Sequence, residues 1–530
     1  MFLISVNQDN QRNPRSIKLE NALKIKKQLN EMHHLKRITI MTTPSKLLSL
    51  IISITLLSSV QAQIITDGTV GRADTLTGPN YIIGDDLGSQ RGQNLFHSFQ
   101  DFNVNTGESA QFTGPASINN VFSRVTGGRD SFIDGKISST MPNADLYLIN
   151  PSGIMFGEHA SLNVPASFYA STADQIILKD GTRFDATTPG TTPILSAEPF
   201  ESFGFLDDTQ APVSVKGSFL EVSEGRTLGL VGGDVNISSE AELSSGGQIQ
   251  IESQNQAKLG NISVDNSRVT AAGRIFFRAG KLVFGNNSRV KAFSSTGKSQ
   301  IEIDANVLNI NNSSFFTKES ESDNLHAGDI LITATKSVTL SGKSKRGDEP
   351  TISVATSGQG DAGSISIETP TLEIIGGAEI NAQTTASGKG GTVRIEEADN
   401  VTLKDNSNII VTTSGNGNAG FLSINTNNLT LTNNSSIRGS TTGSGKGANI
   451  QIQAKNSIEL SEQSWIAVAT DGSGDAGLLN INTDTLDLKK SSIAAGILLS
   501  GTGNGNLLQI NANNIRLSKG EIPFKIDPLR

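Results

Sequence analysis

From about Leu228 onward, alternating apolar and polar positions recur along the chain at a regular spacing. Each repeat opens with a glycine-rich turn and a short alternating stretch. The six clearest copies are GDAGSISI (360–367), GKGGTVRI (388–395), GNAGFLSI (417–424), GKGANIQI (445–452), GDAGLLNI (474–481) and GNGNLLQI (503–510). Their fourth residues lie 28 or 29 positions apart, and weaker copies continue upstream. Alternation with a period of two residues predicts strands that bury one face.

Two further strand-like pieces follow in each repeat. The second piece is an apolar pair such as Leu429-x-Leu431, and the third begins after a small residue, as Ser435 does before Ile437. Three strands in about 28 residues with no helix between them predict a parallel β-helix of about ten coils after residue 245. Polar corner residues such as Asn433 and Asn434 are expected to stack as ladders. An antiparallel sandwich would not explain the constant spacing.

The first 62 residues differ in composition from the rest. They carry nine Lys and Arg against three acids, which is +6, so the whole-chain −8 leaves −14 for residues 63–530. An apolar run from Leu47 to Leu57 ends in Val60-Gln61-Ala62, which predicts a signal peptide cleaved between Ala62 and Gln63. Either Met41 is the true start or residues 1–40 are a basic extension; the sequence leaves both open. No later stretch is apolar and long enough to span a membrane as a helix.

Residues 63–206 are rich in phenylalanine, with twelve of the 22 in the chain, which predicts a denser core than in residues 207–530. Phe99 and Phe102 cannot share one strand face, so a bulge is expected between them. Within this part, NADLYLINPSGIMFG (143–157) reads as strand, turn and strand. The turn consists of Asn150, Pro151, Ser152 and Gly153, and Ile154 opens the next strand. Asn suits the first turn position because its side chain can bond the backbone two residues later.

Several sequence motifs around this turn resemble the secretion domain of the filamentous-haemagglutinin family of two-partner secretion exoproteins. They are GQNLFHSFQDFNV (92–104), NVFSRVTGG (120–128), SFIDGKI (131–137), LNVPASFYASTAD (162–174) and FGFL (203–206). The family's turn usually reads Asn-Pro-Asn-Gly-Ile, so Ser152 is a mild departure, and the family's Asn-Pro-Asn-Leu motif is absent. The resemblance covers roughly residues 64–206. It implies a secretion domain over residues 63–206, and an extension to about 300 stays open.

The resemblance implies an all-β fold, a right-handed parallel β-helix with an N-terminal cap and extra-helical strands. Residues 64–90 are the expected cap. It also implies a partner, an outer-membrane β-barrel transporter with periplasmic domains, and a secretion motif at Asn150 to Ile154. The chain is then exported through the periplasm to the cell surface or the medium, where residues 207–530 form a β-helix repeat region. An adhesin-like structural protein with a cell-surface or carbohydrate ligand is the function expected.

Enzymatic chemistry has little support in the sequence. There is no cysteine, and His97, His159 and His326 show no metal-ligand spacing and no nucleophile-elbow motif. No cofactor or metal is therefore expected, and the acidic chain argues against nucleic acid. The alternative is a secreted β-helix enzyme that degrades polysaccharides through clustered acids. Glu319 with Glu321, and Glu396 with Glu397, are the candidates, but neither pair is expected to face another acid one coil away.

An insertion breaks the repeat between the copies at 328 and 363, where the spacing grows to 35 residues. It contains Arg346, Gly347 and Asp348, a tripeptide that integrins recognise. An inserted, charged loop is expected to project from the coil. A receptor-binding loop and an ordinary exposed turn are both consistent with this sequence.

Overall fold

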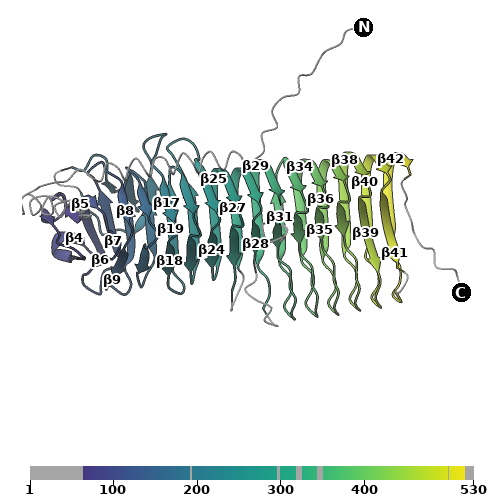
Figure 1. The fold of residues 1–530 in the computed structure, drawn as a ribbon, viewed down its shortest axis with the longest axis horizontal. Helices are drawn as coiled ribbons and strands as arrows, with labels where there is room; N and C mark the ends of the chain where they lie inside the picture. Colours follow the sequence, from purple (N-terminus) through teal and green to yellow (C-terminus); the bar gives the residue numbers. More distant parts are fainter. Residues whose placement is uncertain are drawn as a thin grey trace, which may run out of the picture. The chain divides into compact units, whose positions relative to one another are not determined.

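A computed structural model describes residues 64–190, 194–294, 299–317, 325–342, 350–498 and 501–519. They lie in one compact unit, Ala62–Arg530. The unit is a parallel β-solenoid of about 15 turns with about 28 residues per coil, which confirms the fold predicted from the repeats (Figure 1). Among the described residues, none belongs to a helix long and apolar enough to cross a membrane.

The largest sheet carries the first and second pieces of each coil. Its strands are β1 (Ile64–Thr66), β2 (Asp74–Thr75), β4 (Ser89–Arg91), β5 (Asn94–Phe102), β7 (Asn120–Val125), β8 (Ser131–Ile133), β10 (Asp145–Ile149), β11 (Ile154–Phe156), β13 (Phe168–Ser171), β17 (Val213–Lys216), β19 (Thr227–Gly232), β20 (Val235–Ser238), β22 (Gln248–Ser253), β23 (Asn261–Asp265), β25 (Arg274–Gly285), β27 (Gln300–Asn311), β29 (Asp329–Ser341), β31 (Ser364–Glu368), β32 (Thr371–Ile375), β34 (Thr392–Lys404), β36 (Phe421–Thr432), β38 (Asn449–Ser461), β40 (Leu479–Lys489) and β42 (Leu508–Ser518). The first two pieces often merge: β34 pairs in parallel with both β31 and β32.

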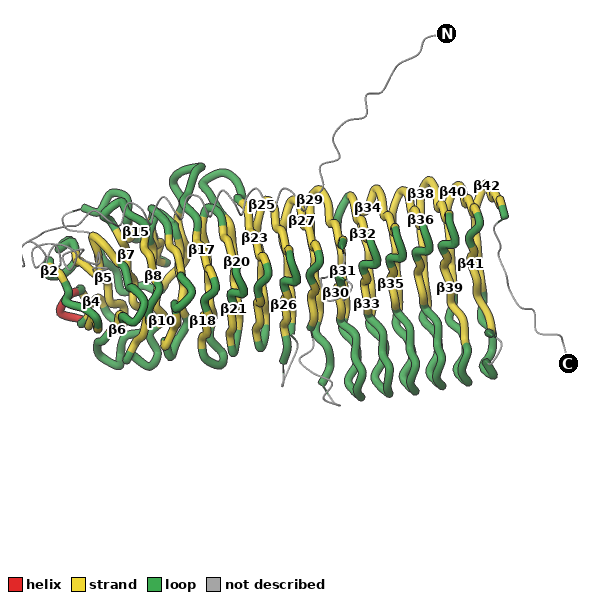
Figure 2. The backbone as a smooth tube through the Cα atoms, viewed as in Figure 1, coloured by secondary structure: helices red, strands yellow, loops and turns green. Residues whose placement is uncertain are grey.

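The third pieces form a second parallel sheet, which runs as a continuous ladder in Figure 2. Its strands are β18 (Phe219–Val222), β21 (Glu242–Ser245), β24 (Arg268–Ala271), β26 (Arg289–Ala292), β28 (Ser314–Phe316), β30 (Thr351–Ser353), β33 (Glu379–Asn381), β35 (Asn408–Ile410), β37 (Ser436–Arg438), β39 (Trp465–Thr470) and β41 (Ser492–Ile497). A four-stranded sheet of β3 (Asn80–Ile83), β6 (Ser109–Phe112), β9 (Lys136–Ser139) and β12 (Ser161–Asn163) serves the first coils. A short 3-10 helix, η2, spans Asp85–Leu87.

The corners of the coils carry the polar ladders expected from the sequence. The Asn433 side chain donates a hydrogen bond to Asp405 at 2.7 Å, and Asn434 donates to Asn406 at 2.8 Å, one coil earlier. Asn433 and Asn434 have φ angles of 53° and 61°, a region that Asn tolerates better than most residues. Asparagine at these corners therefore supplies both the turn conformation and a bond between coils.

The glycine-rich turns stack backbone on backbone. A Cβ atom on Gly420 would lie 1.6 Å from the carbonyl oxygen of Gly391, and one on Gly417 would lie 1.8 Å from that of Gly388. Those separations are far below contact distance, so the coils can approach this closely only where the side chain is absent. Glycine fills the Gly417 position in all six copies, whereas Ala448 stands at the Gly420 position in the next coil, so the packing requirement is strictest at Gly417.

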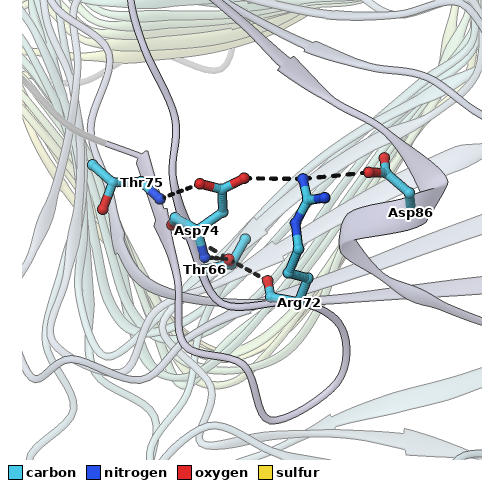
Figure 3. A network of polar contacts seen from close by, with 5 residues as sticks. All are labelled: Thr66, Arg72, Asp74, Thr75 and Asp86. Atoms are coloured by element: carbon cyan, nitrogen blue, oxygen red, sulfur yellow. Dashed lines mark hydrogen bonds and ion pairs between the residues drawn. The ribbon is translucent and has the colours of Figure 1, made fainter.

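Antiparallel strands close the N-terminal end of the described solenoid. Both β1 and β4 pair antiparallel with β5, while β7 continues from β5 in parallel. A polar network supports this cap: Arg72 forms ion pairs with Asp74 at 3.0 Å and Asp86 at 3.5 Å (Figure 3). The cap within residues 64–90 is confirmed, and it covers the strand edge that would otherwise invite aggregation.

The pairing of β1 with β5 shifts register opposite Gln100, which is the expected bulge between Phe99 and Phe102. The bulge turns both phenylalanine side chains into the core, where each is at most 1% exposed.

Candidate functional site

The turn that follows β10 is closed by its own asparagine. The Gly153 N–H donates to the Asn150 carbonyl at 3.0 Å, and the Ser152 N–H donates to the Asn150 side-chain oxygen at 2.9 Å. The second bond is the contact two residues along that the sequence predicted. Gly153 has a φ of 123°, which disfavours any residue with a Cβ. Ser152 contributes its backbone to the turn, so its difference from the usual family residue leaves these bonds intact.

Asn150 also joins two coils. Its side chain is fully buried, and its amide donates to the Arg129 carbonyl at 2.9 Å and to the Ser131 hydroxyl at 3.0 Å, both in the preceding coil. On the opposite side, the Ile154 N–H donates to the carbonyl of Pro212 at 3.3 Å. The turn is therefore held between the corners of the coils before and after it.

A surface hollow of about 400 Å³ adjoins this turn, lined in part by Gly128, Asp130, Gly153 and Pro212. Arg129 also lines it, and the Arg129 guanidinium forms a two-bond ion pair with the buried carboxylate of Asp101. Paired bonds of this kind fix the orientation of the guanidinium.

Outward-facing aromatic rings form a column across four consecutive coils. Phe96, Phe122, Tyr147 and Tyr169 occupy equivalent positions in β5, β7, β10 and β13, with neighbouring ring centroids 4.7–5.3 Å apart. The next position in the column is Gly229, where a Cβ would lie 2.3 Å from the Tyr169 ring. The column ends there because the Tyr169 ring occupies that space.

An antiparallel sheet outside the solenoid covers this column. It consists of β14 (Gln175–Leu178), β15 (Arg183–Asp185) and β16 (Phe200–Gly204), inserted between β13 and β17. Ile176, Leu178 and Phe184 from this sheet are buried against the rings. The extra-helical strands expected from the resemblance thus supply the second core of the phenylalanine-rich part.

Arg124 ties the cap, the solenoid and the extra sheet together. Its side chain is 1% exposed, and it donates to Ser98 at 2.8 Å, to Thr69 in the cap at 2.8 Å and to the Asp185 carbonyl. The guanidinium lies 4.3 Å from the centroid of the Phe184 ring. Burial lowers the pKa of Arg124 to about 10, opposed by the charges of Asp67 and Asp185, so it stays protonated at neutral pH. Sequence reasoning missed this residue, because its partners are 26 to 61 positions away.

The three histidines among the described residues are held apart in the fold. His97 is fully buried, and its ring faces the Leu87 backbone without a well-formed hydrogen bond to either ring nitrogen. Burial lowers the pKa of His97 to about 4, and the Leu87 backbone opposes this shift. His159 contacts the Asp134 carboxylate at 3.1 Å, and the His326 ring accepts the Asp361 N–H at 3.0 Å. Each histidine therefore has its own local partners or packing.

The prediction that no acid one coil away faces Glu396 and Glu397 was wrong. Glu368 in β31 lies directly opposite Glu396 in β34, and the 28-residue separation equals the repeat length that should have revealed it. The pKa of Glu368 is raised, chiefly by the negative charge of Glu397. Burial and the charge of Glu396 add smaller contributions in the same direction. In the described ranges, no cluster of three or more His, Cys, Asp or Glu is arranged to hold a metal ion.

Several residues singled out in the sequence lie outside the described residues. They are Ala62 and Gln63 at the predicted cleavage site, Glu319 and Glu321, and Arg346, Gly347 and Asp348 in the insertion.

Comparison with known protein families gives a match in the first half of the described unit. Residues 62–301 match the family model described as the TPS secretion domain. The heme/hemopexin-binding protein of Haemophilus influenzae is 33% identical over 76 residues, which are 14% of this chain and 8% of that protein. The crystal structure of the HMW1 secretion domain from Haemophilus influenzae aligns with a TM-score of 0.41 and 17% identity, covering 86% of this chain and 98% of that one.

Residues 62–301 form a two-partner secretion domain, as the turn and its flanking motifs predicted. Such a domain indicates a secreted protein that is exported across the outer membrane, and it implies a cognate outer-membrane transporter.

Proposed function

We propose that the chain is an exoprotein whose transporter is an outer-membrane β-barrel with periplasmic domains, and that the turn from Asn150 to Ile154 is required for export. The observation that carries this proposal is the burial of Asn150. Its side chain bonds the Arg129 carbonyl and the Ser131 hydroxyl in the preceding coil, and it also closes its own turn. The turn holds together the surface that the transporter meets.

Asn150→Ala tests the role of the turn. The variant is expressed with the native transporter, and the chain is quantified in the medium and in the periplasm. We expect it to accumulate in the periplasm. The matched control is Asn428→Ala, which removes a half-buried asparagine of the repeat region that bonds Asn400 in the coil before it. Export of the Asn150 variant at the control rate would contradict the proposal.

Outside the cell, we propose an adhesin-like structural role for the solenoid, on the cell surface or after release. Its outer columns present polar side chains once per coil, such as Asn400, Asn428 and Ser457 in successive coils. A repeated row of similar groups favours many weak simultaneous contacts over one strong site.

Binding of the secreted chain to cultured cells and to a glycan array tests this role. Signals no higher than those of the heat-unfolded chain on both surfaces would contradict it. Incubation with acidic polysaccharides addresses the alternative of a degrading enzyme, and we expect no new reducing or unsaturated ends. New ends that disappear in Glu396→Gln would favour the enzyme.

A further inference from the structure

Two exposed apolar side chains lie in one outward column next to the turn. Met155 in β11 is directly opposite Phe132 in β8, and each is 40% exposed. The column is polar on both sides of this pair, with Asn103 in the preceding coil and Ser214 and Asn236 in the following coils. Exposed apolar neighbours within a polar column indicate a contact surface more than a folding requirement.

The surface hollow of about 400 Å³ lies directly beside this pair, and Met155 forms part of its wall. Gly128 and Gly153 contribute no side chain, and Ser152 and Pro212 are small, so the hollow has room for an incoming side chain. The other outward aromatic column is covered by the chain's own sheet of β14, β15 and β16. The extra sheet does not cover Phe132 and Met155, and both side chains remain exposed.

The charge of the hollow is defined by two neighbouring residues. The Arg129 charge is matched by Asp101, which is 5% exposed. Asp130 is exposed at the rim, and no ion pair joins it to any other described residue. One unmatched carboxylate therefore remains, in a chain that carries −14 beyond residue 62. Such a site attracts a cationic partner and repels an anionic one.

We propose that Phe132, Met155 and this hollow form the docking surface for a periplasmic domain of the transporter, which inserts an apolar side chain flanked by lysine or arginine. The proposal rests on the proposed export function and specifies its contact surface. Two half-exposed side chains and one hollow are far smaller than a stable interface, so the contact is weak and short-lived. That suits a chain that must pass through the transporter and leave it.

The test has two stages. Outer-membrane β-barrels with periplasmic domains are first deleted one at a time in the source cell, and the barrel whose deletion stops export is taken as the transporter. The purified periplasmic domains of that barrel are then titrated against the purified chain without residues 1–62. Phe132→Ser with Met155→Ser is expected to weaken binding about ten-fold, because the apolar contact is lost. Asp130→Lys is expected to weaken it several-fold, and more strongly at low salt. The control is Leu331→Ser, an outward leucine 37% exposed in β29, which should leave binding unchanged.

Melting of every variant is measured alongside binding. Asp130 makes no ion pair among the described residues, so Asp130→Lys should have the melting temperature of the parent. If the double variant unfolds, binding by Asp130→Lys is the result that tests the docking surface. Binding within two-fold of the parent for folded Asp130→Lys, or for the folded double variant, overturns the docking surface and leaves the export function standing. Export that survives deletion of every such barrel overturns the proposed function itself, and the docking surface with it.

Discussion

The ring of Tyr147 stacks on the ring of Tyr169 in the next coil, with centroids 4.7 Å apart and planes 5° from parallel. Tyr147 also contacts Phe122 in the coil before it and Phe200 in the extra sheet. One side chain therefore links the stacking of coils to the sheet that covers them. Aromatic pairs of this geometry add to the stabilisation gained by burial.

Tyr147→Ala is expected to lower the free energy of unfolding of the secretion domain by about 3–5 kcal/mol, because it opens a cavity between the column and the sheet. The measurement is the denaturant midpoint followed by tyrosine fluorescence and circular dichroism. Phe132→Ala is the control, since that exposed ring should cost less than about 1 kcal/mol. Equal midpoints for the two variants would show that the column is not a core.

Arg124→Met is expected to destabilise the same region by about 3 kcal/mol or more. The substitution leaves the Ser98 and Thr69 hydroxyls and the Asp185 carbonyl without their common donor. Arg124→Lys should recover only part of the loss, because one ammonium cannot reach three partners with the fork of a guanidinium. Limited proteolysis between β15 and β16 reports release of the extra sheet. Resistance of Arg124→Met to this cleavage, equal to that of the parent, would contradict the role of Arg124 in holding the extra sheet.

The periodic part of the fold was predictable from the sequence, and the residues that join distant segments were not. Apolar alternation and a glycine every 28 or 29 residues predict the coils, because each coil repeats the same local constraints. The Asn150 turn was also predictable, since its closing bonds are local. Arg124 was not, because its partners come from the cap and the extra sheet, whose positions no local pattern encodes. The Glu368–Glu396 neighbours were readable from the repeat and were missed.

Acid is expected to destabilise the first coils through His97. Its pKa falls from 6.5 to about 4 on folding, so the folded state favours the neutral ring. The folded chain binds fewer protons than the unfolded chain between these values, and stability therefore decreases as pH falls from 6.5 to about 4. The full effect is about 3 kcal/mol, which is present above pH 6.5 and lost below about pH 4.

The matched variant for this prediction is His97→Phe, which keeps an aromatic ring between Phe99 and Phe112 and cannot titrate. Melting temperatures measured from pH 7.5 to 4.5 should fall less steeply in the variant than in the parent. Parallel curves would assign the acid sensitivity to carboxylates instead.

Gly417→Ala is expected to disrupt the stacking of the glycine-rich turns. Its Cβ would lie 1.8 Å from the Gly388 carbonyl oxygen, a backbone atom that cannot rotate away, so the two coils must separate locally. We expect a loss of about 3 kcal/mol. Hydrogen exchange is the better measurement, because a solenoid opens in parts and a single unfolding midpoint averages over them.

Protection should fall in β34 and β36, the strands that follow the two stacked turns, and remain at parental values in the secretion domain. Gly505→Ala is the control from an equivalent turn, where the nearest atoms to the added Cβ lie at 3.6 Å and 3.8 Å, an ordinary contact. Equal exchange in the two variants would mean that the turns are loose enough to absorb a methyl group. The glycines would then reflect turn flexibility, and close backbone stacking would no longer explain their spacing.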